Sequence, residues 1–161
     1  MTETDALVLI AELAVGLIAA AGIVTAVGGR ERDYTLIDRM RIISLVTFAA
    51  IPLATSLFSI VLITGTVQPP LLWSLASCAQ ILMMVAHTAW GQRKAREFAS
   101  DTKSRVSRAN VAVLMALSLV CLSLLLYNAI LLGAFWPVVG VCSYYILVSV
   151  WLVLRLVLES T

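Results

Sequence analysis

Charge is scarce in this sequence. Only 12% of its 161 residues are Asp, Glu, Lys or Arg, whereas 61% are hydrophobic. A soluble domain needs far more polar surface than this, so the composition excludes an ordinary soluble protein.

Metal-ligating and catalytic side chains are also scarce. The chain has one histidine, His87, and its three cysteines do not stand at ligand spacing. A multi-ligand metal site or a bis-His haem within one chain is therefore not expected, and neither is any other cofactor. No Ser, His and Asp set, cofactor loop or di-acid motif occurs at a plausible shared depth, so an intramembrane enzyme is the weakest hypothesis.

Long apolar runs fill most of the chain. Each is about as long as the ~20 residues that an α-helix needs to cross a bilayer. Charge interrupts them only at Glu12 and Arg155. The sequence predicts an all-α integral membrane protein that forms a single transmembrane helical domain over residues 1–161, with five spans at about 7–28, 42–65, 71–90, 111–133 and 138–157.

Basic residues are absent from the N-terminal tail and from the turns around 66–70 and 133–137. All 11 lie between the first and second spans, between the third and fourth, or at the end of the fifth. Because positive charge is retained on the cytoplasmic side, this alternation predicts an outer N-terminus and a cytoplasmic C-terminus. We expect the basic loops to contact anionic lipid headgroups. Nucleic-acid binding is not expected, because acidic residues are interleaved with the basic ones.

Glu12 is the carboxylate of the apolar stretch "LVLIAELAVGLIAAAG". In the predicted orientation it lies roughly 8 Å below the outer edge of the hydrocarbon. Facing lipid would be costly, so we expect it to point into protein or a water-filled cavity. It is either an ion or proton site or an acid hydrogen-bonded to a facing helix, and Tyr127 and Asn128 lie at a comparable depth. The sequence leaves both alternatives open.

Small residues line the helix face that carries Glu12. On helical spacing Gly16, Ala19 and Ala26 share this face, and Gly22 lies at its border. Such a stripe lets another backbone approach closely, from within the fold or from a second copy. We therefore predict a packing surface here rather than a pore lining.

The second and third spans carry further polar residues. Pro52 interrupts the second span as a candidate hinge, and the hydroxyls near it either line a polar path or bond to their own helix, which we favour. On the third span Gln80 and His87 belong to a polar face that runs toward the cytoplasmic end. A lone histidine there is more often structural than a switch. The candidate residues for an ion pathway are Glu12, Gln80, His87 and Asn128.

The segments "ELAVG", "GGRERD" and "IDRMRI" give the first quarter of the chain a family resemblance. An acid early in the first span, followed by a basic Asp-Arg segment before the second, resembles a group of uncharacterised small bacterial polytopic inner-membrane proteins. The resemblance implies a multi-pass protein of the bacterial inner (plasma) membrane and nothing about activity.

Two functional hypotheses follow from these features. The first is a homo-oligomeric ion channel or carrier, because a chain this small cannot enclose a wide path alone. The second is a non-catalytic membrane scaffold or accessory subunit, in which the intramembrane polar residues hold helices together. They differ in whether a symmetric assembly brings Glu12 or the Gln80 face to its axis.

Overall fold

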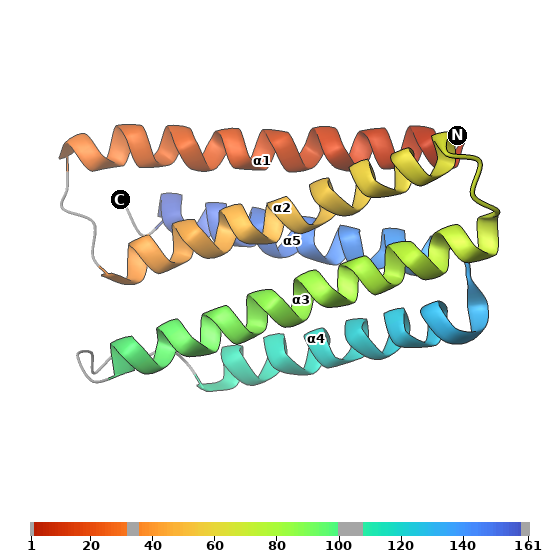
Figure 1. Cartoon of the computed structure of the whole chain (residues 1–161). Helices are drawn as coiled ribbons and strands as arrows, with labels where there is room; N and C mark the ends of the chain where they lie inside the picture. Colours follow the sequence, from red (N-terminus) through yellow and green to blue (C-terminus); the bar gives the residue numbers. More distant parts are fainter. Residues whose placement is uncertain (1, 32–35, 100–107, 159–161) are drawn as a thin grey trace. The chain divides into compact units, whose positions relative to one another are not determined.

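The computed structural model describes residues 2–31, 36–99 and 108–158. In these ranges the chain is helical: α1 (Glu3–Glu31), α2 (Leu36–Thr64), α3 (Pro69–Ala99), α4 (Arg108–Tyr127), the π-helical turn η1 (Asn128–Leu132) and α5 (Phe135–Leu158). Figure 1 shows their order along the chain. The prediction of an all-helical fold is confirmed for the described residues.

Five segments of the described helices are long and apolar enough to cross a membrane: Glu3–Ala26, Met40–Thr64, Pro69–Arg93, Val113–Leu132 and Phe135–Leu156. These segments confirm the number of predicted spans and agree with a multi-pass membrane protein. The helices extend beyond several predicted limits, because helix length follows hydrogen bonding and capping as well as apolar composition.

A reciprocal cap starts α1 earlier than predicted. The Thr2 backbone N–H donates to Asp5 Oδ2 at 2.8 Å, and the Asp5 backbone N–H donates to Thr2 Oγ1 at 3.1 Å. This arrangement is a capping box that satisfies N–H groups without a partner inside the helix. Proline starts α3 in a comparable way, since Pro69 and Pro70 occupy its first turn, where a missing N–H costs nothing.

The described chain divides into two compact units, of which the first consists of Met1–Val67 and Val139–Thr161. In this unit α1 and α2 run in opposite directions, and α5 runs in the direction of α1 (Figure 1). Ala21 of α1, Leu45 of α2 and Leu156 of α5 form a buried apolar cluster. The rings of Phe48 and Tyr145 add a contact between α2 and α5, with centroids 5.6 Å apart.

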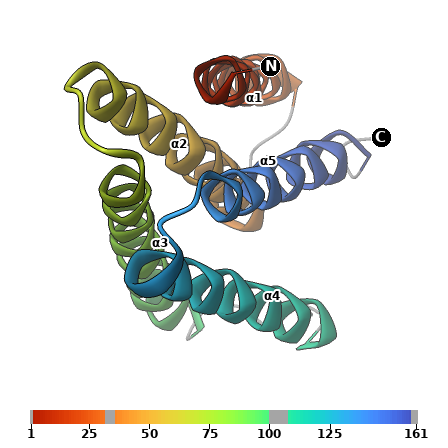
Figure 2. The ribbon, with the colours of Figure 1, turned by 90° about the vertical axis from the view of Figure 1, so that its right-hand side faces the viewer.

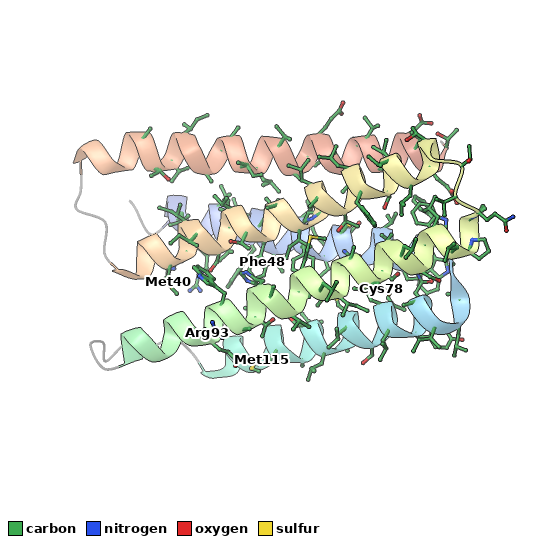
Figure 3. The ribbon with its side chains drawn as sticks, in the orientation of Figure 1. Met40, Phe48, Cys78, Arg93 and Met115 are labelled. Carbon is green, nitrogen blue, oxygen red and sulfur yellow. The ribbon has the colours of Figure 1, made fainter. Side chains whose placement is uncertain are left out.

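The second unit consists of Gln68–Val138, with α3 and α4 antiparallel. Figure 2 turns the η1 end of this pair toward the viewer and shows α4 beside α3. In Figure 3, Arg93 and Met115 lie toward the opposite end of the same two helices. The prediction of one domain over residues 1–161 remains a prediction, since each unit is described by itself.

Candidate functional site

Glu12 lies on the exposed face of α1. The buried face of this helix carries Leu7, Ile10, Ala14 and Ala21. Glu12 and Ala21 are nine residues apart, so at about 100° per residue they point in opposite directions. Within its unit Glu12 therefore points away from α2 and α5, which pack against the other side of α1, and the expectation that it faces protein or a water-filled cavity remains a prediction.

The small residues predicted to form a packing surface lie on this same exposed face. Gly16, Ala19, Gly22 and Ala26 are all exposed. A Cβ added at Gly16 or Gly22 would meet nothing within 4 Å. The stripe is therefore not used for packing against α2 or α5 within its unit, and its role in packing against another molecule remains a prediction.

Asn128 closes the corner between η1 and α5. Its Nδ2 donates to Ser77 Oγ at 2.8 Å and to the Ala134 carbonyl oxygen at 3.0 Å. Its Oδ1 accepts from the Ala134 backbone N–H at 2.9 Å. Both amide hydrogens are used within this unit, so Asn128 has none left to donate to Glu12. The local arrangement is that of a structural clamp, and a part in an ion pathway remains a prediction.

Gly133 and an aromatic pair complete this corner. Gly133 has φ 54°, and its N–H donates to the Asn128 carbonyl oxygen at 2.9 Å, which ends the π-helical turn. Trp73 of α3 is 2% exposed. Its ring lies 4.8 Å from that of Phe135, centroid to centroid. The corner is thus fixed by hydrogen bonds and by ring packing together.

The polar face predicted for α3 is largely buried. Ser77 and Gln80 are fully buried, and Met84 is 5% exposed. His87 is half-buried, and its ring centroid lies 6.3 Å from that of Trp90. The Thr88 hydroxyl donates to the Met84 carbonyl oxygen of its own helix at 2.8 Å. Ser77, Gln80 and Met84 share one buried face of α3, and a part of this face in an ion pathway remains a prediction.

The hydroxyls of α2 mostly bond to their own helix, which was the favoured alternative. Thr47 donates to the Ile43 carbonyl oxygen at 2.8 Å. Thr55 donates to that of Ile51 at 2.9 Å, and Ser59 to that of Thr55 at 2.8 Å. Pro52 is buried within a continuous α2, and a hinge there remains a prediction.

Sequence reasoning missed Ser56 of α2. Its side chain is fully buried, and its Oγ makes no hydrogen bond with the described residues. The sequence holds a weak signal for it, since Ser56 lies between Thr55 and Ser59 on a helix with few other polar groups. A single hydroxyl is too little to define a binding site.

Among the described residues, no group of three or more His, Cys, Asp or Glu side chains lies close enough together to hold a metal ion. The basic loops were predicted to contact anionic headgroups. Most of their residues fall in 27–39 and 94–112, where the structure describes no side chains.

At the end of α5, the guanidinium of Arg155 lies 4.9 Å from the centroid of the Trp151 ring, a cation–π contact.

Comparisons with protein-family models, with curated proteins and with solved structures found no match to this chain. The resemblance of the first quarter to small bacterial inner-membrane proteins gains no support from them. Any functional proposal must therefore come from the chain's own residues.

Proposed function

We propose that the chain is a homo-oligomeric ion channel or carrier whose subunits meet along α1. The observation that carries the proposal is Glu12, an ionisable side chain at the centre of the exposed face of an apolar span. Ionisable residues within transmembrane segments usually face a protein interior or a water-filled path and mark ion or proton pathways. Within its own unit Glu12 meets neither of these, and the proposed assembly would supply one.

Orientation in the membrane is part of this proposal. The placement of all 11 Lys and Arg residues favours an outer N-terminus and a cytoplasmic C-terminus. A multi-pass fold is compatible with any of several cellular membranes. Of these, we propose the inner (plasma) membrane of a cell. Anionic lipids are the proposed partners of its basic loops.

Site-specific labelling tests the orientation. In a variant without native cysteines, Thr4→Cys and Asp101→Cys should react with an impermeant thiol reagent from opposite sides of the membrane. Thr4 is chosen because Thr2 belongs to the α1 cap. Reaction of both positions from the same side would contradict five crossings with this orientation.

Replacing Glu12 with glutamine tests the ion pathway. Glu12→Gln keeps the shape and hydrogen bonding of the side chain and removes its ability to ionise. If Glu12 lines the path, ion flux into liposomes containing the purified protein should change in rate or in pH dependence over about pH 5 to 8. Folding and the mass of the detergent-solubilised complex should be unchanged.

Leu13→Ala is a matched control for this variant. Leu13 is exposed on α1 next to Glu12, points about 100° away from it and carries no ionisable group. Its flux should equal that of the parent protein. Parent-like flux from Glu12→Gln across the same pH range would reject a functional role for this carboxyl.

A scaffold or accessory subunit is the second candidate, and a specific observation favours it. Asn128 binds Ser77 and Ala134, and several span hydroxyls bond to their own helices, so many intramembrane polar groups have structural partners. A scaffold would show no ion flux in liposomes. It would also place Glu12 against a different protein rather than against a second copy.

A further inference from the structure

The exposed face of α1 shows where two copies of this chain would meet. Glu12 lies at its centre, and Asp5, Gly16, Ala19, Ile23 and Ala26 lie within about 40° of it at 100° per residue. All of them are exposed. The positions 5, 12, 19 and 26 recur every seven residues, the period that keeps one face against a neighbouring helix in a left-handed pair. The face is continuous over the length of the apolar span.

A carboxyl at the centre of this face must be covered. A charged group facing hydrocarbon is expensive, and an uncharged carboxyl still needs a hydrogen-bond partner. The chain has no Lys or Arg before residue 30, from 42 to 92, or from 109 to 154. In the predicted topology every basic residue lies at or beyond the cytoplasmic end of a span, so no copy of this chain would carry a basic side chain at the membrane depth of Glu12. Neutralisation has to come from something other than an ion pair within the assembly.

We propose that the α1 faces of two copies meet in parallel and that their Glu12 carboxyls form a hydrogen-bonded pair that holds at least one proton. This inference rests on the homo-oligomer of the proposed function and identifies the ion at that site as the proton. Copies inserted in the same orientation, related by a two-fold axis, bring each residue of the face opposite its own copy.

The chemistry of the face is complementary to itself. A protonated carboxyl has one O–H donor and a carbonyl acceptor, so two carboxyls can satisfy each other. Gly16, Ala19 and Ala26 add little bulk, which allows the backbones to approach closely enough for this contact. A lipid chain would offer neither a donor nor an acceptor, and a different protein would have to carry a polar side chain at the same depth.

A proton fits this pair better than a metal ion. Calcium takes about six to eight oxygen ligands, and magnesium about six. Apart from Glu12, the central part of the face consists of Gly, Ala and branched aliphatic side chains, which offer no oxygen. Two carboxylates in close contact in a low-dielectric site cannot both remain ionised. A shared proton therefore satisfies the carboxyl pair, whereas the pair supplies too few oxygen ligands for a metal ion.

No other described titratable group of this unit lies beside Glu12. On α1 itself, Glu3 and Asp5 lie about two turns or more away, and the Asp5 carboxylate accepts the Thr2 backbone N–H in the capping box. The helices α2 and α5 pack on the Ala21 side, opposite Glu12. Their described titratable side chains, all on that side of α1, are Arg41, Cys142, Tyr144, Tyr145 and Arg155.

Disulfide trapping in liposomes tests the interface with the full-length protein. In a variant without native cysteines, Ala19→Cys should form a disulfide-linked dimer on mild oxidation. Leu57→Cys, on the exposed side of α2, should stay monomeric. Adding Gly16→Leu should lower the Ala19→Cys dimer yield about tenfold, a loss of roughly 1.4 kcal/mol of association. A dimer yield from Ala19→Cys no higher than from Leu57→Cys would overturn the interface.

Gly140→Leu is a matched control for Gly16→Leu. Gly140 is an exposed glycine of α5, and like Gly16 it has nothing within 4 Å of an added Cβ. Both substitutions replace a helical glycine by the same side chain, but only Gly16 lies on the α1 face. The Gly140→Leu variant should give the parental dimer yield, and an equal loss in both variants would contradict a specific α1 contact.

Infrared spectroscopy tests the proton. At neutral pH the parent protein should show the carbonyl stretch of a protonated carboxylic acid, and Glu12→Gln should lack it. A dimer that forms through α1 without this band would overturn the carboxyl pair. Ion flux separates the two proposals: a trapped α1 dimer with the band but no flux refutes the transport function alone, whereas flux with the dimer but without the band refutes the carboxyl pair alone.

Discussion

Replacing Gly133 with alanine is expected to destabilise the protein by on the order of 3 kcal/mol. Gly133 has φ 54°, in the left-handed region that costs any residue with a Cβ. An added Cβ would also lie 2.7 Å from the Pro70 carbonyl oxygen and 3.0 Å from its Cα. These are backbone atoms at the start of α3, so no side-chain rotation can relieve the clash.

Thermal unfolding in detergent measures this effect. Gly140→Ala is the matched control, because Gly140 is helical and an added Cβ there meets nothing within 4 Å. That substitution should leave stability unchanged or raise it by up to about 1 kcal/mol, since alanine loses less backbone entropy in a helix. Equal unfolding temperatures for the two variants would show that the corner can relax and that its geometry is not constrained as described.

Replacing Asn128 with leucine should have an effect of similar size. It removes three hydrogen bonds at once and leaves the Ser77 hydroxyl and both backbone groups of Ala134 without that partner. A buried polar group without its partner costs about 1–3 kcal/mol, so a loss on the order of 3 kcal/mol is expected for the variant. The leucine side chain is close in volume, which limits the cavity that it leaves.

Two serine variants calibrate this result in the same unfolding assay. Ser77→Ala removes one of the three bonds and should cost about 1 kcal/mol. Ser123→Ala removes a hydroxyl that is bonded to the Leu119 carbonyl oxygen of its own helix and should be nearly silent. If Asn128→Leu were as silent as Ser123→Ala, the clamp would make no contribution to stability.

The sequence predicted the spans better than their details. Apolar length is a property of consecutive residues, so the number of spanning helices followed directly from it. The α1 cap depends on the Thr2 and Asp5 pair, which precedes the first predicted span at residue 7, so apolar length did not predict it. The π-helical turn at Asn128 was not predicted, because its ending at Gly133 depends on the approach of Pro70, more than sixty residues earlier.

Sequence periodicity indicates which residues share a helix face but not where that face points. It placed Glu12 and Gly16 on one face, and in the structure both are exposed on α1, whereas their membership of a functional site remains a prediction. It did not say whether that face packs inside the chain, because α1 is apolar on all sides and amphipathicity gives no direction. For Asn128, depth alone suggested a link to Glu12, whereas the partners found are Ser77, 51 residues away in sequence, and Ala134.

The hydroxyl bonds of α2 and α5 have a mechanical consequence. Thr55, Ser59 and Ser149 each donate to a carbonyl oxygen one turn earlier in the same helix. When either helix rotates about its own axis, the donor and the acceptor of each bond move together. None of these three bonds therefore opposes such a rotation. The contact between the Phe48 and Tyr145 rings would change in such a rotation, so it helps to fix the orientation that these three bonds leave free.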